Sequence, residues 1–584
     1  MSYEAEQLAI RLWLDKITSW WKSFRARLST IPRKWVVLLL IGGLAAYALL
    51  LRCLHLLQPG HYFVVSADSY FFDWLARGIM NGTPHPNYPG GADPYALHSG
   101  LAYPLAYIAK AVSSVFGLSN GDALALVSKF LPPVLGVISI VLIYLVAARI
   151  SNRRVGLFSA LAWASILNAV FIGAAGYLDR DGLSMLLVLT GAFLFYLCRG
   201  WQFRIGGRDV GWLLAGLGVL GIEGILYLEW VALGPVLLLV IIGIYFIVRY
   251  LMEYSYLLKT EPSMIRRLAT ATRAVNWRTF ALIMGVNIVY AAGLHSQTVA
   301  WYNLATVFFF RPGEQNPVAE LQGLGFIDLL NYHFFLIPIA VGIYLAWKRR
   351  DEGGIFFSSW FIFLLACSLF STRLLYYALP AACLIAGLGL NALWGWGKWT
   401  LIKPLLKKLA VVALFFFMIL FAVYFSYQMS SSPGIAVDKD WHDAMIYLRD
   451  KTPEDAKIMT WWGYGYWILD MGERRPVVDN GYYGWDTQRL IDIRTAYLST
   501  DTTEAVQLME KYGADYFIFS KIDEYSAPGI IAYPNTPKQI DGKWEEFPED
   551  SLVSRSLAGD FQSEGGLEVV HRNPGVVILG LTQR

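Results

Sequence analysis

Long apolar segments separated by short charged connections dominate this sequence. A helix needs about 20 mostly apolar residues to cross the hydrocarbon core of a bilayer. Stretches near that length cover residues 35–55, 126–149, 154–176, 182–199, 230–251, 278–296, 326–347, 354–371, 374–396 and 404–428, and a weaker one covers residues 209–226. The mean hydropathy of +0.45 is typical of a membrane protein. We therefore expect a multispan α-helical membrane protein with about eleven spans.

The charge of the chain is divided between two unlike parts. The formal net charge is +4, yet residues from Asp438 onward hold 25 acidic and 15 basic side chains, whereas the preceding part holds 19 acidic and 33 basic ones. The basic residues of the first part cluster before residue 35 and within residues 149–154, 199–208, 249–278, 348–350 and 398–408. These are alternate connections between spans, so the positive-inside rule places them in the cytoplasm. The other connections, and everything after about residue 429, are then expected outside.

Two segments are predicted to lie at the membrane surface rather than across the membrane. Residues 13–34 are basic and amphipathic, which is typical of an interfacial helix on the cytoplasmic face. Residues 97–118 are apolar, but a full span there would break the charge pattern, so this helix is expected to lie at the interface or to re-enter. Because the basic clusters lie beside spans, lipid headgroups explain them better than nucleic acid does.

A polar linker, Ser-Ser-Ser-Pro-Gly at residues 430–434, follows the last span. The sequence is therefore divided into a cytoplasmic N-terminal segment, a transmembrane domain with external loops and an extracytoplasmic mixed α/β domain, at residues 1–34, 35–429 and 430–584. In the last domain, the residue pattern predicts helices over residues 438–451 and 501–512, and strands over residues 457–462, 515–520 and 576–579. The second helix has threonines at its start and Gly513 as its expected C-cap.

Four carboxylates stand on the connections that are expected outside. Asp68 lies in the long first external loop, Asp179 and Asp181 form an Asp-Arg-Asp turn between two spans, and Glu320 lies in the loop before Phe326. Two carboxylates two residues apart in a turn can converge on one hard cation, and Mg²⁺ or Mn²⁺ prefers such oxygen ligands. Each acid by itself also fits a solvated loop, and the Asp-x-Asp pattern alone is a weak signal.

A tryptophan pair opens the segment Trp461-Trp462-Gly463-Tyr464-Gly465 in the expected external domain. Indole N–H groups need hydrogen-bond partners, and glycine lets another backbone approach closely, so this run predicts a stiff amphipathic wall. The run resembles the tryptophan-tryptophan-aspartate-tyrosine-glycine signature of the oligosaccharyltransferase catalytic subunit, including the single-subunit bacterial and archaeal enzymes.

The resemblance extends over nearly the whole chain. The family has an aspartate in its first external loop, an Asp-x-Asp in the second and a glutamate in a later one, all before the tryptophan motif. Asp68, Asp179, Asp181 and Glu320 match that order and that side of the membrane. The resemblance implies a GT-C glycosyltransferase fold with about 11–13 transmembrane helices and a C-terminal extracytoplasmic α/β domain.

The activity implied by the resemblance is protein N-glycosylation. The family transfers a preassembled oligosaccharide from a polyprenyl pyrophosphate lipid to the side-chain nitrogen of asparagine in Asn-x-Ser/Thr. By this resemblance Asp68 and Glu320 are the candidate catalytic residues, because two carboxylates could hold the poorly nucleophilic amide in an attacking geometry. Asp68, Asp179, Asp181 and Glu320 are the candidate ligands of Mn²⁺ or Mg²⁺.

Further candidate residues bind the two substrates. Arg373 follows Ser371-Thr372 where a span turns at the external face. The resemblance implies that it binds the pyrophosphate of the lipid donor, whereas an interfacial snorkelling arginine is the simpler interpretation. Trp461, Trp462, Gly463 and Tyr464 are the candidate residues for recognition of the sequon hydroxyl two positions after the asparagine.

The sequence departs from the family pattern at two places. Gly463 stands where the signature has aspartate, so one acceptor for the Ser/Thr hydroxyl is missing. Some bacterial members carry an arginine about a dozen residues after the loop glutamate, where it reads an acidic residue two before the asparagine. Residues 321–335 contain no arginine or lysine, so that extended sequon is not expected to be required. The second sequon-contacting motif of the family has no clear counterpart in residues 485–584.

Two other classes of protein stay open on these residues. Another GT-C enzyme, which moves a single sugar to a lipid or a protein hydroxyl, would share the first-loop acid and the Asp-x-Asp turn but not the tryptophan motif. A lipid or solute transporter would place its ionisable groups near the bilayer midplane instead. The preferred interpretation is a single-subunit enzyme of the inner (plasma) membrane, with its active site on the periplasmic side, that binds membrane lipid, a lipid-linked oligosaccharide and acceptor proteins.

Overall fold

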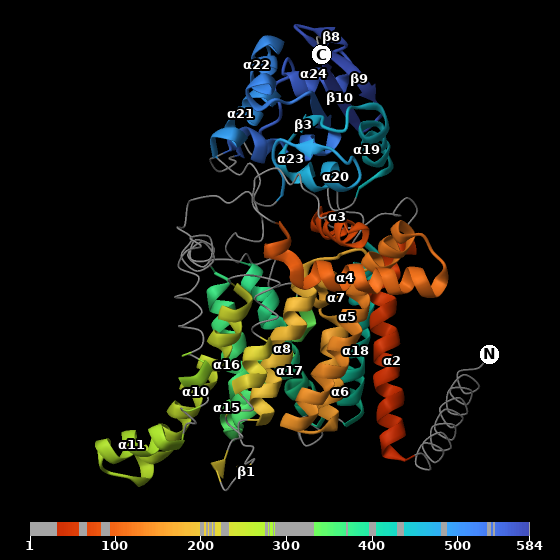
Figure 1. Cartoon of the computed structure of the whole chain (residues 1–584). Helices are drawn as coiled ribbons and strands as arrows, with labels where there is room; N and C mark the ends of the chain where they lie inside the picture. Colours follow the sequence, from red (N-terminus) through yellow and green to blue (C-terminus); the bar gives the residue numbers. More distant parts are fainter. Residues whose placement is uncertain are drawn as a thin grey trace, which may run out of the picture.

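The computed structural model places an α/β domain on one end of a helical bundle (Figure 1). It describes residues 32–57, 67–82, 94–198, 204–205, 208–209, 213, 216–222, 233–274, 278, 281–283, 285, 332–369, 372–395, 404–428, 437–480, 487–533, 539–540 and 543–582. The expected N-terminal interfacial helix, the linker at residues 430–434, Glu320 and most of the expected spans at 209–226 and 278–296 lie outside these residues.

Helices run side by side through the lower body of the molecule (Figure 1). They are α2 (Arg33–Cys53), α5 (Asn120–Ile150), α6 (Arg153–Ser165), α7 (Leu167–Ile172), α8 (Arg180–Cys198), α10 (Leu233–Thr260), α15 (Leu336–Arg349), α16 (Glu352–Cys367), α17 (Arg373–Gly395) and α18 (Pro404–Gln428). Within the described residues, four helical stretches are long and apolar enough to cross a membrane, namely Lys34–Leu57, Asn120–Ile150, Leu238–Leu258 and Leu374–Gly395. The prediction of a multispan helical bundle is confirmed.

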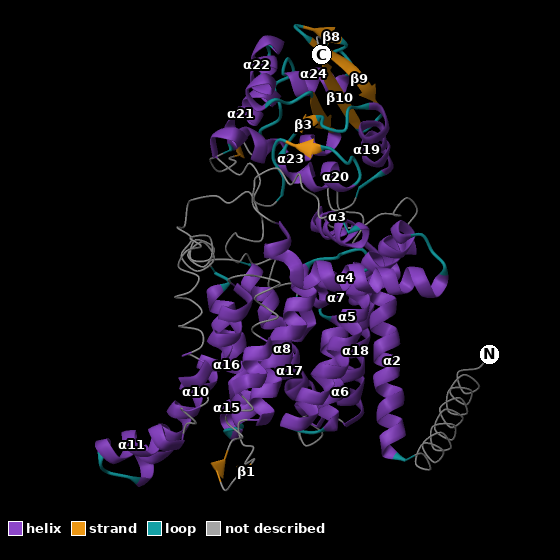
Figure 2. Ribbon diagram, viewed as in Figure 1, coloured by secondary structure: helices purple, strands orange, loops and turns teal. Residues whose placement is uncertain are grey.

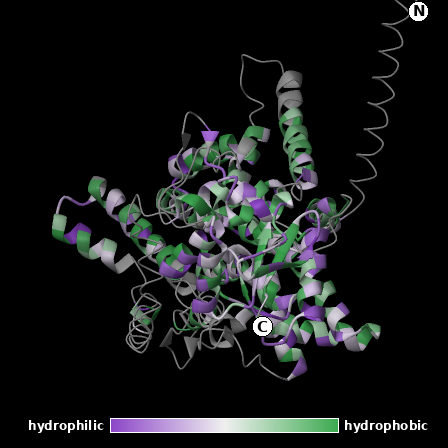
Figure 3. Ribbon diagram, turned by 90° about the horizontal axis from the view of Figure 1, so that it is seen from above, coloured by the Kyte–Doolittle hydropathy of each residue, from purple (hydrophilic) through white to green (hydrophobic). Residues whose placement is uncertain are grey.

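The outer surface of the bundle is apolar. Large side chains such as Leu39, Phe416 and Phe417 are more than half exposed on it. Figure 3 shows hydrophobic residues along many of the helices when the molecule is seen from above. A soluble protein rarely exposes apolar surface of this extent, whereas lipid tails solvate it without cost. The bundle therefore has the surface of a multi-pass membrane protein.

The span expected over residues 154–176 is not one continuous helix. It breaks at Ile166, whose ψ of 128° is extended, into α6 and the six-residue helix α7. An irregular backbone segment then follows α7 as far as Asp179. Non-helical backbone inside a membrane bundle is tolerated only where other protein groups bond to it.

Two further helices lie across the end of the bundle that faces the α/β domain. They are α3 (Ala67–Asn81) and α4 (Pro94–Phe116), and Figure 1 shows both close to horizontal above α5 and α7. The placement of α4 agrees with the surface helix expected over residues 97–118. The helix α11 (Met264–Ala274) lies at the opposite end, where the sequence predicts the basic connections.

The C-terminal domain is built on a six-stranded mixed sheet in the order β4-β3-β5-β10-β9-β8. Figure 2 shows strands of this sheet among the helices of the domain. The strands are β3 (Lys457–Met459), β4 (Arg475–Pro476), β5 (Tyr516–Ser520), β8 (Ser563–Glu564), β9 (Leu567–Arg572) and β10 (Val576–Leu581). β3 pairs in parallel with β4 and β5, and β10 pairs antiparallel with β5 and β9. Two small hairpins, β1-β2 (Arg204–Ile205, Arg208–Asp209) and β6-β7 (Gln539–Ile540, Lys543–Trp544), lie apart from this sheet.

Helices pack around the sheet. They are α19 (Lys439–Lys451), α20 (Gly465–Asp470), α21 (Thr487–Leu498), α22 (Thr502–Tyr512), α23 (Lys521–Ala532) and α24 (Leu552–Ala558). The predicted C-cap is present, because Gly513 ends α22 at φ 63°. The side chain of Asp438, a residue predicted to lie inside the helix, is the N-cap of α19 and accepts from the Trp441 N–H. The strand expected over residues 457–462 is shorter than predicted, because the chain leaves the sheet after Met459 and turns into a 3₁₀ helix at Trp462–Tyr464.

Candidate functional site

Three parallel strands bring the tryptophan motif together with two loops that are distant in sequence. Parallel neighbours end at the same edge of a sheet, and ligands of such sheets bind outside that edge. The edge carries Trp461–Gly465 after β3, Asp479 and Asn480 after β4, and Ser520 to Asp523 after β5. The same edge faces the helical bundle, because α20 directly after the motif packs against α3.

The two glycines of the motif have different roles. A Cβ at Gly465 would lie 2.3 Å from Asp479 Cα and 2.7 Å from the Val478 carbonyl, so only glycine permits this approach of two backbones. The close approach expected from the sequence is thus present at Gly465. A Cβ at Gly463 would meet nothing within 4 Å. The Gly463 carbonyl accepts a hydrogen bond of 3.0 Å from Asn480 Nδ2, which fixes the loop after β4 to the motif.

A buried carboxyl group lies beneath the tyrosine of the motif. The Tyr464 hydroxyl donates to Asp523 Oδ1 at 2.7 Å, and the Ser520 N–H donates to Asp523 Oδ2 at 2.8 Å. Tyr497 joins the same network, because its hydroxyl accepts from the Trp461 N–H at 3.1 Å. Burial raises the pKa of Asp523 to about 7, against the opposing effect of these hydrogen bonds. The motif backbone is therefore held by a polar network that titrates near neutral pH.

The helix α3 joins the motif to the bundle through aromatic contacts. The ring of Phe71 stacks on Tyr466 with centroids 4.6 Å apart, and Tyr70 meets Trp467 edge to face at 6.4 Å. Tyr466 and Trp467 are the first residues after the motif. Aromatic pairs of this geometry contribute about 0.5–1.5 kcal/mol beyond the burial of their area. The position of the motif over the bundle is thus set largely by one helix.

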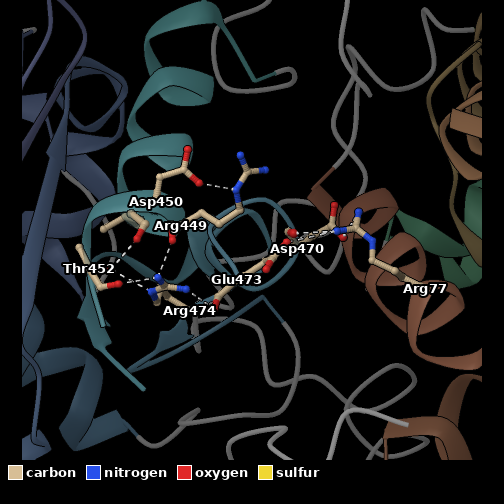
Figure 4. Close-up of polar contacts among 8 residues, drawn as sticks. Arg77, Arg449, Asp450, Thr452, Asp470, Glu473 and Arg474 are labelled. Carbon is tan, nitrogen blue, oxygen red and sulfur yellow. Dashed lines mark hydrogen bonds and ion pairs between the residues drawn. The ribbon is translucent and has the colours of Figure 1, made fainter. Parts of the chain in front are cut away.

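Ion pairs hold the far end of the same helix (Figure 4). Arg77 Nη2 lies 3.1 Å from Asp470 Oδ1 at the end of α20, and Arg77 Nη1 lies 3.9 Å from Glu473. Arg474 beside them donates to the carbonyl groups of Arg449 and Thr452 at the end of α19, at 2.7 and 2.6 Å. Arg77 therefore docks onto a part of the α/β domain that is itself braced.

A buried carboxyl group of α3 faces this joint. Asp73 is 7% exposed and accepts a hydrogen bond from the hydroxyl of Ser128 in α5. Burial and the nearby charge of Asp470 raise the pKa of Asp73. Burial also raises the pKa of Asp470, to about 6, although Arg77 opposes the change. Ionisation of Asp470 therefore disfavours ionisation of Asp73 where the bundle meets the α/β domain.

The N-terminal end of α3 is fixed to the segment that leads into the Asp-Arg-Asp turn. The Ser69 hydroxyl lies 2.9 Å from the Leu178 carbonyl and accepts from the Leu178 N–H at 2.8 Å. Asp68 precedes Ser69 in the first turn of α3, and Asp179 follows Leu178. The hydroxyl of Ser69 thus brings the first-loop acid and the Asp-Arg-Asp turn into one neighbourhood.

The other wall of this neighbourhood is α17. Tyr377 donates a hydrogen bond of 2.9 Å to Asp181 Oδ1, and both side chains are buried. Arg373 begins α17 one helical turn before Tyr377. The predicted donor-binding arginine therefore belongs to the helix that contacts the Asp-Arg-Asp turn.

The described residues bring part of the predicted site together. Asp179 and Asp181 are 6% and 1% exposed, and they flank the first residue of α8. Hard oxygen donors of this kind fit a divalent cation. In the described part of the chain, however, no group of three carboxylate, histidine or cysteine side chains lies close enough to hold an ion. Glu320, the fourth predicted ligand, lies outside that part.

Sequence reasoning missed several residues that contact the candidate site. Asp523 carried a usable signal, because Ser520 and Asp523 form a capping box at the start of α23. Ser69, Tyr377 and Asn480 carried none, since each acts on a segment that only the fold brings near.

Comparisons with known proteins agree on the fold. No protein-family model matches the chain. A solved structure of the Archaeoglobus fulgidus oligosaccharyltransferase in the apo form superposes with a TM-score of 0.70 at 13% identity, over 92% of this chain and 80% of that chain. The same archaeal enzyme in complex with Zn and sulfate gives a TM-score of 0.62 at 15% identity, over 91% of this chain and 79% of that chain. ArnT from Cupriavidus metallidurans in the apo state gives 0.51 at 12% identity, over 94% of this chain and 98% of that chain. The predicted multispan GT-C fold is confirmed.

Sequence similarity is shorter in extent. The chain is 26% identical over 249 residues to the STT3B subunit of the dolichyl-diphosphooligosaccharide–protein glycosyltransferase of Oryza sativa subsp. japonica, over 35% of this chain and 34% of that subunit. The STT3 subunit of Dictyostelium discoideum is 26% identical over 239 residues, over 35% of this chain and 32% of that subunit. The chain thus spans about a third of the length of the curated relatives that it matches.

Proposed function

We propose that this chain is an oligosaccharyltransferase, which transfers a glycan from a lipid-linked pyrophosphate donor to asparagine in Asn-x-Ser/Thr sequons. One observation carries the proposal: a single helix, α3, contacts both halves of the site. Its first turn is bonded to the segment before Asp179, and its aromatic side chains pack on Tyr466 and Trp467 next to the tryptophan motif. An acceptor peptide bound at the motif is thereby presented to the carboxylates of the bundle.

The acceptor amide is the chemical difficulty in this reaction. Its nitrogen lone pair is delocalised into the carbonyl group, so the amide is a poor nucleophile. Asp68 and Glu320 are assigned to accept the amide N–H groups, which orients the nitrogen towards the anomeric carbon. Asp68 suits this role because it lies in the first turn of α3. The same helix packs against α20, which begins at the last residue of the tryptophan motif.

We further propose that the site binds a divalent ion, Mn²⁺ or Mg²⁺. The Archaeoglobus fulgidus oligosaccharyltransferase has been solved in complex with Zn and sulfate, and the paired buried carboxylates of Asp179 and Asp181 offer the hard donors that divalent ions take. Asp68 and Glu320 are the further proposed ligands. The ion would supply positive charge for the pyrophosphate leaving group. Arg373, at the start of α17, is assigned to bind oxygens of this pyrophosphate through its planar guanidinium.

The tryptophan motif is assigned to the sequon hydroxyl two residues after the asparagine. Trp461 and Trp462 would donate indole N–H bonds, with Gly463 and Tyr464 completing the wall. Two structures of the archaeal enzyme support such a partner, since one carries a tethered acceptor peptide with the NVT sequon and the other an inhibitory peptide with a dolichol-phosphate.

The proposed location is the inner (plasma) membrane, with the α/β domain on the periplasmic side and the chain acting as a single subunit. The charge distribution supports it, because the described basic segments at residues 149–154, 264–274 and 348–350 lie at the end of the bundle away from the α/β domain. The likeness to ArnT keeps a single-sugar GT-C transferase as the rival. The higher TM-score of the oligosaccharyltransferase structures, 0.70 against 0.51, favours the first proposal.

A gel-shift assay tests the proposal. Purified protein is mixed with lipid-linked oligosaccharide, Mn²⁺ and a fluorescent Asn-x-Thr peptide, and a slower-migrating glycopeptide is expected. The same peptide with Gln for Asn should not shift. Asp179→Asn and Asp181→Asn should abolish transfer while the detergent-solubilised protein keeps its melting temperature. If transfer persists in EDTA and in both variants, the metal ion is not required. If no sequon peptide is glycosylated, the proposed activity is wrong.

A further inference from the structure

Arg52 is a buried cation beside the candidate site that the roles assigned above do not use. It is the penultimate residue of α2 and is fully buried. Among the described residues it has no carboxylate partner, and its Nε–H finds no acceptor. An unpaired guanidinium inside a membrane bundle is costly, and such groups persist where they have a function.

Backbone carbonyl groups in the last turns of two helices accept hydrogen bonds from the guanidinium and stabilise its charge. Arg52 Nη2 donates to the carbonyls of Ala169 at 2.8 Å and Trp163 at 3.4 Å, which lie in the last turns of α7 and α6. The Gly173 N–H donates to Phe171 instead of to Ala169, so the Ala169 carbonyl is open to the guanidinium. The C-terminal end of a helix carries partial negative charge, which a cation complements.

Two glycines make the space for the guanidinium. A Cβ added at Gly136 in α5 or at Gly173 after α7 would lie 2.5 Å from Arg52 Nε. Both positions lie in the body of the protein, where a larger residue would force the arginine side chain to move. The guanidinium is thus held between three helices in one position.

The segment that Arg52 holds leads into the Asp-Arg-Asp turn. The Arg52 carbonyl accepts from the Ala175 N–H at 2.7 Å, and the His55 ring donates to the Ala175 carbonyl at 2.9 Å. One further hydrogen bond, from the Gly176 N–H to the Lys129 carbonyl at 2.8 Å, fixes the segment to α5. Without these bonds an irregular segment inside a membrane bundle would have unsatisfied peptide groups.

We propose that Arg52 is a positioning residue for the metal-binding turn: its guanidinium clamps the ends of α6 and α7 and thereby fixes the backbone that presents Asp179 and Asp181. The inference rests on the proposed function only in assigning the ion to these carboxylates. It adds a residue that contacts neither substrate nor ion, and it predicts that loss of the clamp weakens ion binding without unfolding the protein.

Titration with Mn²⁺ alone, followed by the loss of the free-ion electron paramagnetic resonance signal, tests the proposal without any substrate. Arg52→Leu should raise the dissociation constant on the order of tenfold, as substitutions behind metal ligands commonly do. Its melting temperature should change little, because removal of an unpaired buried charge offsets the loss of a donor to the Ala169 and Trp163 carbonyls. Arg52→Lys keeps the charge but not the fork of donors, so an intermediate dissociation constant is expected.

Gly173→Ala is the second variant and keeps the arginine. Its added methyl group should displace the guanidinium and raise the dissociation constant in the same direction, whereas Gly43→Ala on α2, where a Cβ meets nothing within 4 Å, should leave it unchanged. In the Arg52→Leu background, Gly173→Ala should have a smaller effect.

Unchanged Mn²⁺ binding in Arg52→Leu and Gly173→Ala, with weaker binding in Asp181→Asn, overturns the inference and leaves the proposed function standing. A parent protein that binds no Mn²⁺ also overturns it. Weaker binding in both clamp variants, in a protein that glycosylates no sequon peptide, supports the clamp and refutes the proposed function instead.

Discussion

The hydroxyl of Tyr377 donates a hydrogen bond of 2.9 Å to Oδ1 of Asp181, although 196 residues separate them in the sequence. Both side chains are buried. The bond ties α17, which begins at Arg373, to the predicted metal-binding turn. Tyr377 thereby offers a test of the candidate site that does not alter any predicted ligand.

Tyr377→Phe removes only this hydroxyl. The loss of a hydrogen bond to a buried carboxylate costs about 1–3 kcal/mol. Part of this cost is expected to appear in the transfer reaction, with kcat/KM for the lipid-linked donor reduced on the order of tenfold. The rates are measured by the gel-shift assay at saturating Mn²⁺ and peptide. Tyr424→Phe on the exposed face of α18 is the matched control and should be neutral. Equal activity of the two variants would contradict the role of Tyr377.

Arg373→Lys tests the predicted donor site. Lysine keeps the charge but loses the planar fork that fits two phosphate oxygens. The apparent KM for the lipid-linked donor should therefore rise more than the KM for peptide, as measured by initial rates with each substrate varied in turn. An unchanged donor KM and kcat would return Arg373 to the interpretation of a snorkelling arginine.

Gly463→Asp restores the aspartate of the family signature. The position has open space around its Cβ, so the variant should fold normally. A carboxylate acceptor for the sequon hydroxyl should increase the preference of Thr over Ala at the +2 position on the order of tenfold, the effect of one charge-assisted hydrogen bond. Competition between the two peptides measures this ratio.

Gly465→Ala is the structural counterpart of that variant. Its methyl group would meet the backbone of Val478 and Asp479, so a lower melting temperature is expected, in contrast to Gly463→Asp. A Gly463→Asp protein with unchanged +2 preference would show that the hydroxyl is recognised elsewhere.

The raised pKa of Asp523, about 7, predicts a pH dependence of stability. Between the ordinary aspartate pKa near 4 and this value, the folded state binds more protons than the unfolded state. The free energy of unfolding should therefore fall as the pH rises from about 4 to about 7 and then level off. Asp523→Asn should flatten much of this slope in urea titrations monitored by tryptophan fluorescence. Glu549→Gln, at an exposed position, is the control and should keep the slope.

Arg77 is expected to stabilise the joint between the bundle and the α/β domain mainly at neutral pH. The pKa of Asp470 is about 6, and the charge of Arg77 opposes its rise. The ion pair therefore stabilises the joint only at pH values where Asp470 is ionised. Arg77→Met should lower the melting temperature on the order of 2–4 °C at pH 7.5 and by less at pH 5.5. Lys439→Met removes an exposed ion pair with Asp443 and should have no such pH-dependent effect. An equal loss at both pH values would place the role of Arg77 in packing alone.

The sequence by itself determined the features that depend on neighbouring residues. Apolar length predicts helices such as α5 and α17, and capping residues such as Asp438 and Gly513 fix where helices of the α/β domain begin or end, because both signals act within one or two turns. The order of acids and tryptophans along the chain was sufficient to indicate the fold family, since each motif is a short local pattern.

Only the tertiary structure decided what lies around those motifs. The strand order β4-β3-β5 brings Asn480 and Asp523 to the tryptophan motif, and no local pattern specifies which strands become neighbours. The same holds for Tyr377 on Asp181 and for Arg52 on Ala169, which join helices from distant parts of the chain. Inside a bilayer all apolar helices are equally soluble, so hydrophobicity selects the helices but not their partners. Close packing and buried polar contacts select the partners.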